Sequence, residues 1–326
     1  MSHARLAPSN HRWPNCAGSV REESNYPDIP GAAAIDGTGS HLLLEKCLEN
    51  NVPAIQYDGH IIGANHEDQP NGWMVHSDRI ERVQMCLDYI YRRHSELKEK
   101  YPNAVITITS ETESNPGGLF GIKDWYGTVD VTIEARHQHT GDVLFLEVVD
   151  YKDGRGWVHV ANNTQLVSYL AGKMRRYIGS GPDLVRPFRT ERIKNCRITI
   201  VQPKTTPVVR YQCSTRPEDN FSAFTVVELA SKMAKAAYET TKPDAPVTPG
   251  KWCQWCKANP KRGGHCLAAT DKSLQVVKKM SNTEVIAVGD GSNSIFEVIQ
   301  TAFKDVKSLP SDKLSELLSG IVTGKQ

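Results

Sequence analysis

Three strand-like segments in succession, between residues 104 and 152, constrain the fold of this chain most strongly. Residues 104–113 (AVITITSETE) alternate between apolar and polar side chains, as expected for a strand with one buried face. NPGG then provides turn residues, residues 125–135 (WYGTVDVTIEA) form a second such segment, and HQHTGD predicts a hairpin to a third at 143–152. The sequence therefore predicts an antiparallel meander of three strands.

The segments around this meander predict helices and further strands, and so an α/β fold with a central mixed sheet flanked by helices. Helical spacing of apolar residues begins at residue 38, and further helices are expected at 75–100, 159–178 and 221–241. Residues 196–203 and 207–213 read as additional strands. We expect three parts: an extended N-terminal arm (1–36), a core (37–267) and a helical C-terminal extension (268–326).

The end of the meander carries acidic residues next to a lysine. Asp130 and Asp150 fall near the ends of neighbouring strands, so their carboxylates can converge on one cation. Alternation along VLFLEVVDYK puts Asp150 and Lys152 on one face of the strand and Glu147 on the other. Such a set suits metal-assisted hydrolysis, in which the lysine orients water or stabilises developing negative charge.

Four motifs occur in one order: DGTGSHLLLE (36–45), GTVD (127–130), DYKDG (150–154) and TQLVSYL (164–170). This order resembles the RecB-like nucleases of the PD-(D/E)xK superfamily. The resemblance implies a restriction-endonuclease-like core that hydrolyses DNA with Mg²⁺ or Mn²⁺. It further implies roles for six residues: metal binding by Asp130 and Asp150 with help from His41, positioning of water by Lys152, and support of the site or DNA contact by Gln165 and Tyr169. Glu111 and Glu113 are expected to be solvated strand residues.

Three of the eight cysteines cluster near the end of the core, where Cys253 and Cys256 have C-x₂-C spacing and Cys266 follows. By spacing alone this set can hold zinc, with His265 as a fourth ligand. Iron-sulfur members of the RecB-like group, such as the AddB subunit, have one cysteine before the core and three after it. Cys16 matches the first, so the resemblance implies a [4Fe-4S] cluster that joins the N- and C-terminal regions. The other cysteines are expected to be single buried apolar residues: Cys47, Cys86, Cys196 and Cys213.

Composition supports nucleic-acid binding only weakly, because the formal net charge is +2 and the basic clusters are short. No signal peptide or membrane-spanning segment is apparent, which predicts a cytoplasmic protein. Stand-alone proteins of this pattern resemble phage or prophage exonucleases that resect DNA ends, and a single-strand annealing protein is the expected partner. Two other classes stay open: a CRISPR-adaptation-type iron-sulfur nuclease, and a non-catalytic DNA-binding protein with a zinc knot.

Overall fold

The computed structural model describes residues 4–10, 12–161, 163–179, 189–204, 212–213 and 222–269. The chain divides into two compact units, the first made of residues 1–11 and 29–238 and the second of residues 12–28 and 239–326. These boundaries differ from the three expected parts, because residues 12–28 of the expected arm group with the segment that follows the last core helix, and the rest of the arm belongs to the first unit. All but the first two residues of the expected C-terminal extension lie outside the described residues.

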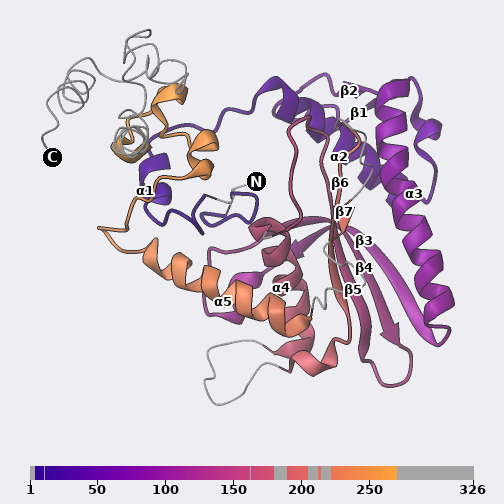
Figure 1. Cartoon of the computed structure of the whole chain (residues 1–326). Coiled ribbons are helices and arrows are strands. Elements are labelled where there is room, and N and C mark those ends of the chain that lie inside the picture. The colour runs from indigo at the N-terminus through magenta and orange to yellow at the C-terminus, as the bar shows by residue number, and fades with distance from the viewer. Residues whose placement is uncertain are drawn as a thin grey trace, which may run out of the picture. The chain divides into compact units, whose positions relative to one another are not determined.

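A five-stranded mixed sheet forms the centre of the first unit (Figure 1). Its strands lie side by side in chain order: β3 (Ala104–Ser114), β4 (Gly127–His137), β5 (Val143–Tyr151), β6 (Cys196–Val201) and β7 (Gln212–Cys213). The expected meander is confirmed, since β3, β4 and β5 pair antiparallel. β6 is parallel to β5 because the chain returns through a helix before it pairs.

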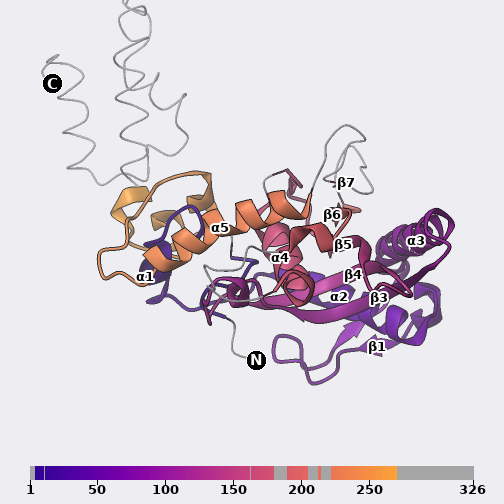
Figure 2. The same cartoon turned by 90° about the horizontal axis from the view of Figure 1, so that it is seen from below.

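Helices cover both faces of this sheet. α2 (Ala32–Asn50) and α3 (Ser77–Lys100) pack their apolar residues against one face, and α4 (Thr164–Ile178) lies on the other (Figure 1). α5 (Ala223–Glu239) runs alongside α4 (Figure 2). The mixed α/β class is thus confirmed, although α2 begins six residues earlier than expected and α4 begins five residues later.

The remaining described elements are short. They comprise α1 (Ser19–Glu23), β1 (Ile61–Ile62), β2 (Trp73–Met74) and five single-turn 3₁₀ helices, at Ala54–Tyr57, Pro116–Leu119, Thr190–Arg192, Lys251–Trp255 and Pro260–Arg262. Within the described part of the chain, no helix has the length and apolar character needed to cross a membrane.

A buried charge fastens α3 to the sheet. Glu147 of β5 is 0% exposed, and its carboxylate accepts hydrogen bonds from the Tyr89 hydroxyl, from Thr199 Oγ1 at 2.6 Å and from Arg93 Nε at 3.1 Å. A buried carboxylate is tolerable only with such partners, because ionised groups are costly to remove from water. Glu147 therefore serves the fold, on the face of β5 opposite to the one expected to carry Asp150.

Glu147→Gln should destabilise the protein by about 3 kcal/mol, because it leaves the buried guanidinium of Arg93 without its buried countercharge. The matched control is Glu96→Gln, which removes a second, 43% exposed carboxylate from the same guanidinium and should cost less than about 1 kcal/mol. Urea denaturation midpoints measure both effects. Equal losses from the two variants would contradict the role given to Glu147.

Candidate functional site

Three carboxylates lie in a row across the end of the meander. Ser110 pairs with Val131 and Thr112 with Val129, which sets Glu111 opposite Asp130. On the other side Val131 pairs with Val149, so Asp130 and Asp150 occupy the next position of that register. One carboxylate is therefore supplied by each of three adjacent strands at the same level of the sheet.

The backbone departs from regular strand geometry at this row. Glu111 has a φ of +44°, in the left-handed region that residues with a side chain rarely adopt. Asp130 Oδ2 accepts a hydrogen bond from Tyr151 N at 2.7 Å, at the point where the backbone pairing of β4 with β5 has ended. Strain of this kind persists only where the surrounding structure enforces it, and it is concentrated at functional sites.

α2 adds a histidine to the row. His41 Nδ1 lies 3.6 Å from Asp130 Oδ2, and its ring meets Tyr151 edge-on at 5.3 Å between centroids. The helix approaches closely because Gly39 has no side chain: a Cβ there would lie 2.5 Å from the Trp73 ring. The glycine that makes this segment look irregular in sequence thus allows α2 to dock.

Lys152, Asp150 and Gln165 form a hydrogen-bonded triangle beside the row. Lys152 Nζ donates to Asp150 Oδ1 at 3.0 Å and to Gln165 Oε1 at 3.2 Å, while Gln165 Nε2 donates to Asp150 Oδ1 at 3.1 Å. Tyr169 follows one turn later in α4, with its hydroxyl 3.5 Å from Gln165 Nε2. All six residues expected from the motifs therefore gather at one end of the sheet.

Burial and mutual repulsion raise the proton affinity of two carboxyl groups. Burial raises the pKa of Glu111 to about 8, with repulsion from Asp130 and Glu45 adding to it. For Asp150, burial and the charge of Asp130 outweigh the attraction of Lys152 and raise the pKa to about 6. Burial by itself would lower the pKa of Lys152, but the negative charges of Asp150 and Asp130 raise it, so the lysine stays cationic.

The geometry of these groups fits a divalent cation. Oxygen or nitrogen atoms of His41, Glu111 and Asp130 lie within 4.8 Å of one another. Asp150 Oδ2 is buried and makes no hydrogen bond among the described residues, although Lys152 Nζ lies 3.0 Å away outside donor geometry. A hard cation with oxygen ligands would satisfy this acceptor and relieve the repulsion between the carboxylates.

The position of Glu111 differs from the one expected from the sequence. Glu111 was expected to be a solvated strand residue, and it instead lies half-buried among the candidate ligands. Glu113, two residues later, is exposed as expected. The only sign of this role in the sequence was that Glu111 is an acidic residue in the strand next to the one that carries Asp130.

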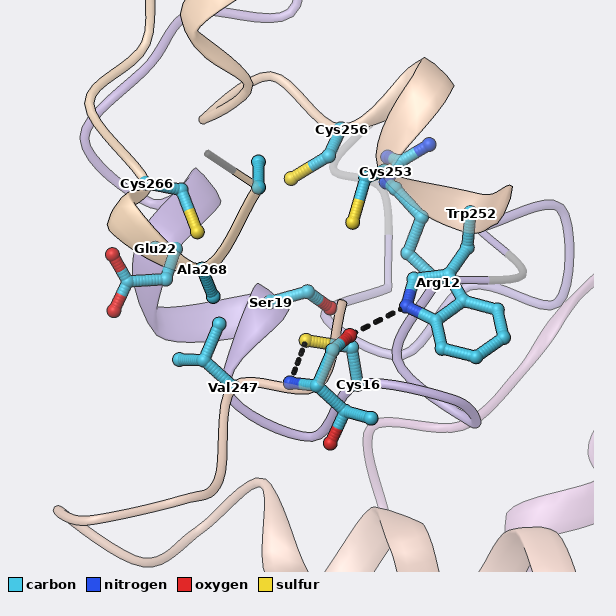
Figure 3. Close-up of a pocket in the computed structure, with 12 residues that line it drawn as sticks. Arg12, Cys16, Ser19, Glu22, Val247, Trp252, Cys253, Cys256, Cys266 and Ala268 are labelled. Atoms are coloured by element: carbon cyan, nitrogen blue, oxygen red, sulfur yellow. Dashed lines mark hydrogen bonds between the residues drawn. The ribbon is translucent and has the colours of Figure 1, made fainter. Parts of the chain in front are cut away.

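The second unit contains a separate pocket lined by four cysteines (Figure 3). Cys16 precedes α1, Cys253 and Cys256 lie in and after a 3₁₀ turn, and Cys266 follows a second turn. Backbone N–H groups of Thr248 and Gly250 donate to the sulfurs of Cys16 and Cys253, each at 3.3 Å.

Hydrogen bonds between protein groups already hold the two segments of this unit together. Buried Glu23 forms an ion pair with Arg12 at 2.6 Å and accepts from Lys257 N at 2.8 Å. Gly18 N donates to Pro246 O at 2.9 Å. The cysteines from residues 12–28 and 239–269 are thus brought to one pocket by the fold of the unit itself.

The pocket does not bring three cysteine sulfurs as close together as a single zinc ion would hold them. With Zn–S bonds of about 2.3 Å, two thiolates on one zinc are separated by at most about 4.6 Å. Among all described residues, His41, Glu111 and Asp130 are the only trio of such ligand atoms mutually within 4.8 Å, so no three cysteine sulfurs are that close. His265 is exposed and does not line the pocket.

Ser19 gives a further indication that the pocket receives a polar group. Its side chain lines the pocket among the cysteines (Figure 3), is 3% exposed, and has a hydroxyl with no hydrogen-bond partner among the described residues. A buried hydroxyl without a partner is costly, and the inorganic sulfides or thiolates of a bound cluster would accept from it.

The remaining cysteines bear out part of the expectation. Cys47, Cys86 and Cys196 are single and buried, and burial raises the pKa of each thiol. The side chain of Cys213 lies outside the described residues.

A family model described as "Protein of unknown function (DUF2800)" matches residues 3–326, so the chain belongs to this family. No curated protein matches the chain.

Mn²⁺ binding at pH 7 should release about one proton, because the raised pKa of Glu111 keeps its carboxyl protonated until a cation takes the carboxylate form. Affinity should accordingly rise from pH 6 to pH 8. Calorimetry in buffers of different ionisation enthalpy measures this release. Glu111→Gln should bind more weakly and lose most of the release, whereas Glu113→Gln on the same strand should match the wild type. Unchanged proton release in Glu111→Gln would show that Glu111 is not a ligand.

Proposed function

We propose that this protein is a Mg²⁺- or Mn²⁺-dependent deoxyribonuclease of the RecB-like PD-(D/E)xK type, acting as an exonuclease on DNA ends. The observation that carries the proposal is the triangle of Asp150, Lys152 and Gln165 beside the ligand trio of His41, Glu111 and Asp130. A carboxylate row alone could be a surface feature. A buried carboxylate joined to an orientated ammonium can help to bind a cation and to stabilise the charge that develops in metal-assisted phosphodiester hydrolysis.

In this proposal the ligand trio and Asp150 would hold the cation, which supplies an acidified water and neutralises charge on the scissile phosphate. His41 would favour Mn²⁺ over Mg²⁺, because imidazole suits the softer ion. Lys152 donates to the attacking water or to the phosphate oxygens, and stabilises the charge that builds up on them. Gln165 fixes the direction of the ammonium through its 3.2 Å hydrogen bond.

The second part of the proposal is a [4Fe-4S] cluster on Cys16, Cys253, Cys256 and Cys266. The four cysteines line one pocket together with the hydroxyl of Ser19, which has no hydrogen-bond partner among the described residues. The resemblance of the motifs favours the cluster over a single zinc ion. We further propose a role in resecting DNA ends during phage or prophage recombination or repair, in the cytoplasm of a bacterial host, with a single-strand annealing protein as partner. Those attributions rest on the resemblance of the motifs.

Asp150→Asn and Lys152→Ala should each reduce cleavage of linear DNA under Mn²⁺ by at least 10²- to 10³-fold, roughly the loss seen when one electrostatic donor is removed. Each variant removes a charged group of the triangle while the surrounding strands stay in place. Glu113→Gln, an exposed carboxylate near the row, should keep wild-type activity. Single-turnover rates, with circular dichroism as a check on folding, measure this.

Closed circular DNA in the same assay should remain intact, since an exonuclease needs an end. Near wild-type cleavage by folded Asp150→Asn would refute the assignment of the site, and efficient cutting of circles would refute the exonuclease mode. A preference for trimming short overhangs would instead point to the CRISPR-adaptation-type activity.

Protein purified without oxygen should contain iron and acid-labile sulfide in about equal amounts. Cys16→Ala and Cys256→Ala should lose both and unfold at a lower temperature, because the two segments of the second unit are no longer cross-linked. Cys47→Ala, a single buried cysteine of the first unit, should keep the iron. Stoichiometric zinc with no iron in the anaerobic preparation would favour the zinc-knot alternative.

A further inference from the structure

The loop between β5 and α4 begins and ends at the proposed catalytic residues. Lys152 is its first residue and Gln165 lies in the first turn of α4 just after it, and their side chains are joined by a 3.2 Å hydrogen bond. Trp157 lies five residues after Lys152, so its Cα is at most about 18 Å from that of the lysine. The chain therefore keeps Trp157 within that distance of the proposed catalytic lysine.

One buried side chain holds the middle of this loop. Gln202, 1% exposed at the end of β6, donates from Nε2 to the carbonyl oxygens of Gly154 at 3.0 Å and Gly156 at 2.6 Å. Its Oε1 accepts from Val158 N at 3.2 Å. These three bonds fix the backbone on both sides of Trp157, so the loop is shaped in advance of any partner.

The indole of Trp157 is presented in a defined orientation. Its Nε1 donates to His159 Nδ1 at 3.0 Å, and the two rings are inclined by 70°. The N–H of the indole is thus satisfied within the loop, while the residue remains 42% exposed. Apolar surface of this size is kept in water at a cost, and an adjacent ring that stacked on it would remove that cost.

We propose that Trp157 is a stacking platform for an unpaired base of single-stranded DNA entering the nuclease site. The inference rests on the proposed function and names its substrate as a single-stranded or frayed end. In a duplex both faces of an internal base are covered by its neighbours, whereas an unpaired base offers a free face to an aromatic side chain. Stacking requires no particular base, so the platform is tolerant of sequence. Arg155, exposed two residues earlier, is placed to contact the phosphate backbone.

The test uses the full chain carrying Asp150→Asn, so that DNA is bound without being cut. Two DNA ligands of the same sequence are compared, a single-stranded oligonucleotide and its blunt duplex, each carrying a terminal dye. Binding is followed by the fluorescence anisotropy of that dye. Adding Trp157→Ala should weaken single-strand binding roughly 10- to 100-fold, the loss expected for one base–aromatic stack. Trp157→Phe should restore most of the affinity. Blunt-duplex binding should change less than about 3-fold.

Phe224→Ala provides the matched control, because Phe224 is an exposed aromatic residue of the same unit on α5 and should leave binding unchanged. Unaltered single-strand affinity in Trp157→Ala, or an equal loss for single strand and duplex, overturns the platform. Cleavage by the wild-type protein, without Asp150→Asn, is measured in parallel. If the wild-type protein cuts DNA while the Trp157→Ala variant binds single strands normally, only the platform fails. If it neither cuts nor binds DNA, the proposed function fails and the platform with it.

Discussion

The hydrogen bond from Tyr151 N to the carboxylate of Asp130 is the interaction on which the rest of the site depends. At this point β5 continues to pair with β6 but no longer with β4, and the Asp130 side chain takes the N–H that a strand backbone would otherwise accept. A buried N–H left without an acceptor would be costly. Because Asp130 satisfies it, the two strands can separate here while the sheet stays intact.

Where β4 and β5 separate, the carboxylates of Asp130 and Asp150 lie close together, and positive charges on neighbouring elements offset them. Lys152 provides the positive charge that lies closest to Asp150. A second group of charged side chains stabilises the segment that follows β5. There Asp153, whose side chain is 0% exposed, contacts Arg82 at 2.7 Å, Ser40 at 2.7 Å and Lys204 at 3.3 Å. Ser40 precedes His41 in α2, so the same network that stabilises the loop also holds the helix carrying the candidate histidine ligand.

The elements that could be predicted from the sequence are those in which apolar residues recur in a regular pattern. The strands of the meander could be recognised because two-residue alternation persists along β3 and β4, while β5 is an almost continuous apolar run. A tight hairpin made β4 and β5 neighbours. Glu111 was missed for a physical reason: a left-handed residue inside a strand breaks the alternation from which the direction of a side chain is inferred. The first turns of α2 were missed because glycines lower helix propensity, while the packing of Gly39 on Trp73 is invisible in local pattern.

The cysteine pocket could not be assembled from local sequence at all. About 240 residues separate Cys16 from Cys253, and only the resemblance of the motifs suggested that they meet. In the folded unit, protein hydrogen bonds such as Lys257 N to Glu23 already join the two segments.

A cross-link over so long a loop lowers the entropy of the unfolded chain, a stabilisation of about 5 kcal/mol by the usual chain model. That contribution acts on the unfolded state, whereas the hydrogen bonds act on the folded one. The pocket therefore retains its shape through its own contacts, and a bound cluster would make that shape harder to lose. The hydroxyl of Ser19, which has no hydrogen-bond partner among the described residues, is a contact that a bound cluster would complete.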